Sequence, residues 1–182
     1  FDDANQVQVF KSTGKVAELQ NSIDKNPVNG NLGIAHTRWA THGIPTETNA
    51  HPHHSNNNVF VIHNGIIENH QEIRTTLKAL GYAFESETDT EVIAHLIHAK
   101  MSKEGASLVE ALQQSVKDLR GAYAIGAVCE TEPGILAAAR KGSPLVVGIG
   151  HGENFIASDQ LALADFAEKF VFLEEGDLAE IT

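Results

Sequence analysis

Residues 88–119, TDTEVIAHLIHAKMSKEGASLVEALQQSVKDL, contain the pattern that decides the fold. Thr88 and Glu91 have the spacing of a capping box, in which the threonine caps free N–H groups and the glutamate reaches back. Apolar residues behind them recur on one helix face. Ser107 and Glu110 repeat the capping pattern in front of a second apolar stripe. We therefore expect two consecutive helices with no strand between them.

Short apolar runs bounded by turn residues flank these helices and predict strands buried on both faces. The predicted strands are residues 32–35, 59–62, 122–128, 135–139, 145–149, 155–157 and 170–173. Ile73, Leu77 and Leu80 predict another helix with Gly81 as its stop signal, and a short one is expected near Ser158 or Asp159. Consecutive helices between groups of strands favour a layered α+β domain over a regular βαβ alternation.

Composition limits the classes of protein that fit the chain. Its 182 residues, 42% hydrophobic, suffice for one core. The net charge of −11 repels phosphate backbones and anionic membranes, so we expect neither nucleic acid nor a membrane as a partner. Cys129 is the only cysteine, which fits a reducing cytosol, and it follows an apolar strand as packing cysteines do. Glu130 and Glu132 argue against a reactive thiol there.

A polar loop after residues 33–35 carries Arg38, Thr41 and His42. The planar guanidinium of arginine can bind a carboxylate through two parallel hydrogen bonds. The alternative, which spacing alone favours, is an arginine in a structural ion pair beside a packed Trp39.

Asn64-Gly65 lies between apolar runs and is first of all a hairpin turn. The pair also has a chemical interpretation. The Gly65 N–H is unhindered and the Asn64 amide carries two donors, and convergent donors of this kind stabilise an oxyanion.

Three carboxylates in residues 86–91 suit the dipole at the start of a helix. In a functional interpretation, Asp89 binds an ammonium group. An arginine for a carboxylate and an aspartate for an ammonium are what an α-amino acid ligand requires. The spacing does not establish that Arg38 and Asp89 face one pocket.

Ten histidines raise the question of a metal site. His51, His53 and His54 cluster in sequence, and His95 and His98 share a helix face. Zinc sites usually combine closely spaced His, Cys and acidic ligands, and the chain has one cysteine. We therefore prefer histidines that form hydrogen bonds in loops over metal ligands.

Eight segments together resemble the glutaminase domains of glucosamine-6-phosphate synthases, from about residue 14 onward. They are residues 36–43, 49–53, 63–69, 86–91, 119–123, 139–145, 153–159 and 172–177. The resemblance implies a single glutaminase domain over residues 1–182 with the four-layer αββα sandwich of N-terminal-nucleophile hydrolases. It implies hydrolysis of the glutamine side-chain amide to glutamate, with the ammonia passing to a sugar-phosphate isomerase domain. A cytoplasmic homo-oligomer, assembled through that domain and using no metal or organic cofactor in this half, is also implied.

The resemblance also assigns roles to individual residues. Arg38 binds the α-carboxylate of glutamine, helped by Thr41 and His42, and Asp89 binds the α-ammonium group. The Asn64 side chain and the Gly65 N–H form the oxyanion hole.

Trp39 lines the pocket and helps gate the route toward the isomerase domain.

The chain departs from the family at the nucleophile, which is a cysteine at the mature N-terminus whose α-amine acts as the base. Residue 1 here is Phe1, and Cys129 is internal. We expect a glutaminase domain truncated at its N-terminus, without the isomerase domain and inactive by itself. The alternatives are another amidotransferase of the class, such as the phosphoribosylpyrophosphate enzyme or asparagine synthetase, and a non-catalytic glutamine- or glutamate-binding module.

Overall fold

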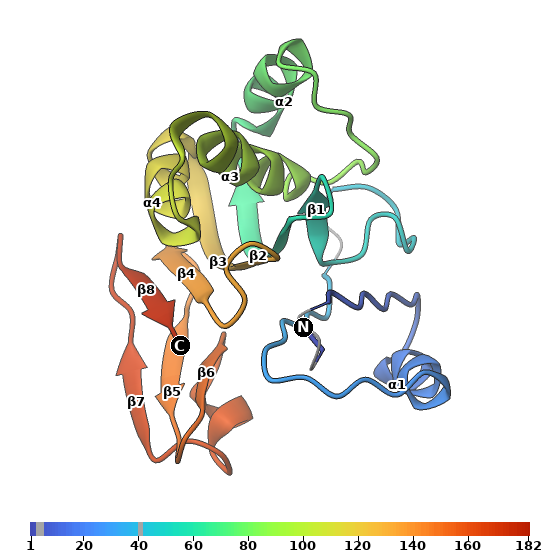
Figure 1. The fold of residues 1–182 in the computed structure, drawn as a ribbon, viewed down its shortest axis with the longest axis vertical. Helices are drawn as coiled ribbons and strands as arrows, with labels where there is room; N and C mark the ends of the chain where they lie inside the picture. The colour runs from blue at the N-terminus through green and yellow to red at the C-terminus, as the bar shows by residue number, and fades with distance from the viewer. Residues whose placement is uncertain (3–5, 40–41) are drawn as a thin grey trace.

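The computed structural model describes residues 1–2, 6–39 and 42–182, and Figure 1 shows their layered α+β arrangement. Within these residues the strands form two antiparallel sheets. The larger sheet has the order β1-β2-β3-β4-β8, made of His53–Ser55, Val59–Ile67, Gly121–Cys129, Leu136–Lys141 and Leu178–Ile181. The smaller sheet has the order β6-β5-β7, made of Asn154–Ala157, Val146–Ile149 and Lys169–Phe172. The strands predicted from residue 59 onward are confirmed, whereas β1 and β8 were not predicted.

Helices α3 (Glu91–Glu104) and α4 (Leu108–Asp118) cover one face of the larger sheet, and α2 (His70–Ala79) packs beside α3 (Figure 1). The main hydrophobic core lies between these helices and the strands and is fully buried at Ile93 and Ile125. The two consecutive helices are therefore confirmed. The capping box at Ser107 is confirmed as well, because Glu110 N–H donates to its hydroxyl and the Glu110 carboxylate accepts from its N–H.

The capping box predicted at Thr88 is wrong. The α3 helix begins at Glu91, and its N-cap residue, Thr90, makes no side-chain capping bond. The Glu91 carboxylate reaches further back than a capping box requires and accepts 2.8 Å hydrogen bonds from the N–H groups of Glu85 and Ser86. The Thr88 hydroxyl instead lies 3.1 Å from Nε2 of His53.

The smaller sheet packs against the opposite face of the larger one, and Val147 and Ile156 contribute to this second core. The outer side of β5 is covered by the short helix η1 (Gln160–Leu163), since a Cβ on Gly148 would lie 2.9 Å from the Leu163 side chain. This helix, capped by Asp159, confirms the prediction near that residue. Helices thus cover one face of the larger sheet and the smaller sheet packs on its other face, so the predicted α+β sandwich is confirmed.

The N-terminal region is less regular than the rest. Helix α1 (Val16–Lys25), which was not predicted, buries none of its residues and lies to one side of the sandwich (Figure 1). The strand predicted at residues 32–35 is wrong, because no strand is assigned there in the described ranges. Leu32 and Ile34 still alternate inward and pack against the second core, so the apolar pattern reflects burial without strand pairing. None of the described helices has the length and apolar character needed to cross a bilayer.

Candidate functional site

The half-buried Arg38 side chain organises the loop that follows it. Its guanidinium donates to the backbone carbonyls of His42, of Gly43 at 3.2 Å and of Ile44 at 3.4 Å. Among the described residues Arg38 forms no ion pair, and the Trp39 side chain is 91% exposed. The interpretation of a structural ion pair beside a packed tryptophan is therefore wrong.

Asp89 is buried and joins strand β2 to the loop that Arg38 organises. One of its carboxylate oxygens accepts a 2.8 Å hydrogen bond from the Ile67 N–H, and the other lies 3.8 Å from Nδ1 of His42. His42 therefore links the two residues: its ring faces Asp89, and its backbone carbonyl accepts from Arg38.

The segment before α3, residues 84–91, is fixed from several sides. The Arg74 guanidinium donates to the carbonyls of Ser86 at 3.0 Å and Thr88 at 2.8 Å and lies 4.3 Å from the centre of the Phe84 ring. The Glu91 carboxylate also accepts a 2.6 Å bond from the Ser86 hydroxyl. Burial alone would raise the pKa of Glu91, but the His95 ring, whose Nε2 lies 3.6 Å away, and hydrogen bonds from Ser86 and Glu85 lower it from 4.5 to about 2. Glu91 is therefore ionised at neutral pH, and its carboxylate positions the Asp89 segment.

Asn49, for which no role is predicted from the sequence, connects the two loops. Its side-chain amide is buried and donates to the Ile44 carbonyl at 3.0 Å and to the Glu87 carboxylate at 3.1 Å. Its side-chain oxygen accepts from the Glu87 N–H at 3.0 Å. The irregular sequence around it signalled a functional loop but could not reveal these long-range contacts.

The hairpin turn predicted at Asn64-Gly65 is wrong, because both residues lie inside β2, opposite Ala124 and Tyr123 of β3. Gly65 has φ +131°, and a Cβ there would lie 2.0 Å from the Ala122 carbonyl oxygen. The glycine is needed because two strands approach closely, and its conformation is one that other residues rarely adopt. The Asn64 side chain is exposed, and its Oδ1 lies 2.8 Å from Nε2 of His36.

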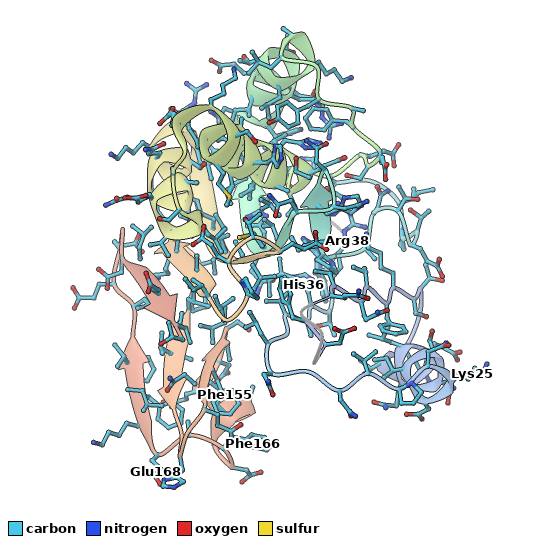
Figure 2. The ribbon with its side chains drawn as sticks, viewed as in Figure 1. Lys25, His36, Arg38, Phe155, Phe166 and Glu168 are labelled. Atoms are coloured by element: carbon cyan, nitrogen blue, oxygen red, sulfur yellow. The ribbon has the colours of Figure 1, made fainter. Side chains whose placement is uncertain are left out.

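Two adjoining cavities share His36 and Thr37 in their walls. One, of about 240 Å³, is also lined by Asn64, and the other, also about 240 Å³, is lined by Arg38. Figure 2 shows Arg38 and His36 near each other at the centre of the molecule. The structure thus connects Arg38, His42 and Asp89 through contacts, whereas Asn64 contacts His36 and lines a separate, adjoining cavity. Trp39 lines neither of these two cavities. Thr41 lies outside the described residues.

The histidines form hydrogen bonds with buried hydroxyl groups. Nε2 of His51 lies 3.1 Å and Nδ1 of His63 lies 3.0 Å from the Thr90 hydroxyl, and Nδ1 of His95 lies 2.8 Å from the Ser55 hydroxyl. Burial lowers the pKa of His53 to about 3, so its ring is neutral at pH 7. Burial also lowers the pKa of His63, although the Asp89 carboxylate opposes the shift. In the part of the chain described, no three His, Cys, Asp or Glu side chains gather as metal ligands.

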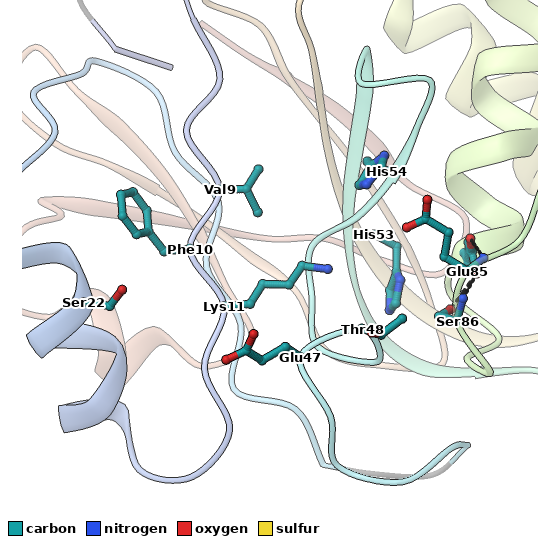
Figure 3. Close-up of a pocket in the computed structure, with 11 residues that line it drawn as sticks. Val9, Phe10, Lys11, Ser22, Glu47, Thr48, His53, His54, Glu85 and Ser86 are labelled. Atoms are coloured by element: carbon teal, nitrogen blue, oxygen red, sulfur yellow. Dashed lines mark hydrogen bonds between the residues drawn. The ribbon is translucent and has the colours of Figure 1, made fainter. Parts of the chain in front are cut away.

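A further cavity of about 450 Å³ backs the Asp89 segment (Figure 3). Glu47, Glu85 and Glu91 line it together with Lys11, whose side chain extends toward β1. Burial lowers the pKa of Lys11, and the three carboxylates act in the opposite direction. None of the residues assigned to glutamine from the sequence lines this cavity.

Cys129, the only cysteine in the sequence, is fully buried in the main core. Burial raises the pKa of its thiol, and Thr131 Oγ1 lies 3.5 Å from the sulfur. A thiol in this state is a packing residue, as the sequence predicted, and not a nucleophile.

Comparison with protein families identifies residues 36–165 as a glutamine amidotransferase domain. The chain belongs to this family. It is 55% identical over 181 residues to the glutamine–fructose-6-phosphate aminotransferase (isomerizing) of Pseudomonas aeruginosa, covering 100% of the chain and 30% of that relative. It is 55% identical over 178 residues to the Haemophilus influenzae enzyme of the same name, covering 98% of the chain and 29% of the relative. The chain thus spans about 30% of the length of the curated relatives it matches.

Solved structures of amidotransferases share the fold. The glutamine phosphoribosylpyrophosphate amidotransferase of B. subtilis, complexed with ADP and GMP, matches with a TM-score of 0.79 and 26% identity, covering 98% of this chain and 39% of that one. A structure described as the allosteric regulatory enzyme of purine biosynthesis matches with a TM-score of 0.76 and 27% identity, covering 92% and 36%. The identity of the chain to the Pseudomonas aeruginosa fructose-6-phosphate enzyme is therefore about twice its identity to the B. subtilis phosphoribosylpyrophosphate amidotransferase.

Proposed function

We propose that this amidotransferase domain binds glutamine and supplies ammonia, in the full-length protein, for conversion of fructose 6-phosphate to glucosamine 6-phosphate. The observation that carries the proposal is the series of contacts from Arg38, through His42, to Asp89. The Asp89 carboxylate also accepts from Ile67 of β2, the strand that carries Asn64 and Gly65. A cationic and an anionic side chain thus lie at the two ends of one network, as the carboxylate and ammonium of an amino acid require.

In the proposed reaction, the thiolate of an N-terminal cysteine of the full-length protein attacks the side-chain amide carbon of glutamine. The carbonyl oxygen becomes an oxyanion, which the Asn64 amide and the Gly65 N–H stabilise. The carbon–nitrogen bond then breaks, the nitrogen takes up a proton and ammonia leaves. Water hydrolyses the resulting thioester and releases glutamate and the thiol. Cys129 does not supply the nucleophile, because its thiol is buried.

Arg38 must change its contacts to bind the substrate carboxylate. One of its terminal nitrogens donates to two carbonyls and the other to a third. A bidentate grip needs two parallel N–H groups, so at least one carbonyl has to be released. We propose that the carboxylate of glutamine displaces these carbonyls and that the loop at residues 42–44 rearranges. Thr41 and His42 assist at this end, and Trp39 lines and gates the completed pocket.

Glutamate release and glucosamine 6-phosphate formation by the full-length protein test the proposal. We expect Arg38→Ala to raise KM for glutamine about 10–100-fold, because hydrogen bonds to charged groups contribute about 1.5–3 kcal/mol each. Arg120→Ala is the matched control, since that guanidinium pairs with Glu72 at an exposed site and its loss should leave KM unchanged. An unchanged KM in Arg38→Ala would refute the clamp, and phosphoribosylamine in place of glucosamine 6-phosphate would reassign the acceptor.

We further propose that the full-length protein is a cytoplasmic homo-oligomer assembled through a sugar-phosphate isomerase domain.

A second candidate function concerns the 182-residue chain alone. Its only thiol is buried, which favours binding of glutamine or glutamate without hydrolysis. Calorimetry with glutamate should show binding that Arg38→Ala abolishes, whereas equal binding by both chains would exclude this candidate.

A further inference from the structure

His36 contacts the one side chain of the proposed oxyanion hole. Its Nε2 lies 2.8 Å from Oδ1 of Asn64, although the two residues come from an irregular segment and from β2. The carbonyl oxygen of an asparagine side chain only accepts hydrogen bonds. His36 must therefore donate, and its proton must reside on Nε2.

The surroundings of His36 favour that tautomer. Its Nδ1 is buried and has no hydrogen-bond partner among the described residues. With the proton on Nε2, the unpaired Nδ1 is an acceptor. With the proton on Nδ1, that atom would be an unpaired donor, and Nε2 and the Asn64 oxygen would face each other as two acceptors. Burial lowers the pKa of His36 below its usual 6.5, and the Arg38 charge acts in the same direction, although hydrogen bonds with the Asn64 side chain and the His63 backbone oppose the shift.

The His36 ring is linked through His51 to the segment that carries Asp89. It packs on the ring of His51 with centroids 4.0 Å apart. His51 in turn contacts the Thr90 hydroxyl, which also contacts His63. Thr90 directly follows Asp89 in the chain, so a series of contacts extends from the proposed ammonium site to the proposed oxyanion site.

The orientation of the Asn64 amide decides whether it can serve a reaction. An oxyanion is stabilised by the Nδ2 donor and repelled by the Oδ1 acceptor. We propose that His36 is a positioning residue for glutamine hydrolysis: its Nε2–H holds Oδ1 of Asn64 and thereby turns Nδ2 toward the cavity that Asn64 lines. This inference rests on the proposed glutaminase function and adds a residue to it.

A matched pair of substitutions in the full-length protein tests the donor. The side-chain amide nitrogen of glutamine, Nε2, can occupy the position of histidine Nε2. The amide nitrogen of asparagine reaches only the position of histidine Nδ1. We expect His36→Asn and His36→Leu to lower kcat for glutamine hydrolysis about 10–100-fold, somewhat less than loss of an oxyanion donor. KM should change little, because the amino acid clamp is untouched, and His36→Gln should restore most of kcat. His151→Leu, at an exposed histidine, should match the wild type.

A double-mutant cycle separates positioning from general destabilisation. We expect Asn64→Ala to lower kcat, and His36→Asn to cause no further loss in the Asn64→Ala protein. Equal losses in both backgrounds, or an inactive His36→Gln protein with an unchanged melting temperature, would overturn the positioning role. An unchanged kcat in Asn64→Ala would instead overturn the proposed oxyanion hole itself. If His36→Leu does not fold, His36→Asn and His36→Gln still decide the question.

Discussion

The two loops that carry the charged ends of the proposed clamp differ in how they are held. The Asp89 segment is buried and fixed by the Glu91 carboxylate and the Arg74 guanidinium. The loop at residues 42–44 is held by Arg38, the very group proposed to bind substrate, and by Asn49. The proposed ammonium site is therefore preformed, whereas the proposed carboxylate site would have to exchange internal contacts for substrate contacts. Preorganisation of one end limits the ordering cost of binding to the other.

The largest expected effect comes from removing the acceptor that fixes the Asp89 segment. Glu91→Ala leaves two backbone N–H groups and the Ser86 hydroxyl without their acceptor. Each unsatisfied buried group costs about 1–3 kcal/mol, so we expect the three groups together to lower the free energy of unfolding by at least about 3 kcal/mol. Denaturant unfolding measures it. Glu85→Ala, at an exposed carboxylate, is the control, and equal stability of the two variants would mean that the segment is not anchored by Glu91.

Acid should release the same segment. The folded-state pKa of Glu91 is lowered from 4.5 to about 2, so its contribution to stability is present above pH 4.5 and is lost as the pH falls toward 2. We expect the melting temperature to decline over this window and Glu91→Gln to decline less steeply. Parallel curves for the two proteins would contradict the assignment.

A smaller effect is expected from Asp89→Asn. Asparagine keeps an acceptor for the Ile67 N–H but loses the charge that an ammonium group needs. We expect KM for glutamine to rise about 10–100-fold with little change in stability, since a hydrogen bond to a charged group contributes about 1.5–3 kcal/mol. Steady-state kinetics of the full-length protein measure this. Asp165→Asn, at an exposed position, should leave KM as in the wild type.

The smallest effect concerns local opening. We expect glutamate to slow amide hydrogen exchange at residues 42–44 by a few-fold and to leave residues 85–91 unchanged, because only the first loop gains order on binding. Exchange followed by mass spectrometry resolves the two segments. Equal protection of both loops would show that the Asp89 segment is not preformed.

Local patterns predicted the layers well. The stripe behind Ser107 and the apolar runs from residue 59 onward each depend on neighbours a few positions apart, and the helices and strands follow them. Contacts over long sequence separations could not be anticipated in this way. Local spacing predicts a cap at Thr88, whereas the actual partner of its hydroxyl, His53, lies 35 positions away in the sequence. Asn64-Gly65 has the composition of a turn, and only the approach of Ala122 explains its place in a strand.

The site was predicted in part. The motif wording pointed to Arg38, His42 and Asp89, and the structure connects them. The motifs did not indicate the buried bridge made by Asn49 or the histidine network around Thr90, because both depend on which loops meet in space. The roles of these residues in turnover stay predictions until the kinetic measurements are made.

Gly65 shows how closely stability and chemistry are tied in this domain. The backbone N–H proposed to face the reacting oxygen belongs to the residue at which β2 and β3 leave no room for a side chain. Any mutational path that alters this donor must first break the sheet, so natural variation and directed evolution alike would have to adjust specificity from the surrounding loops.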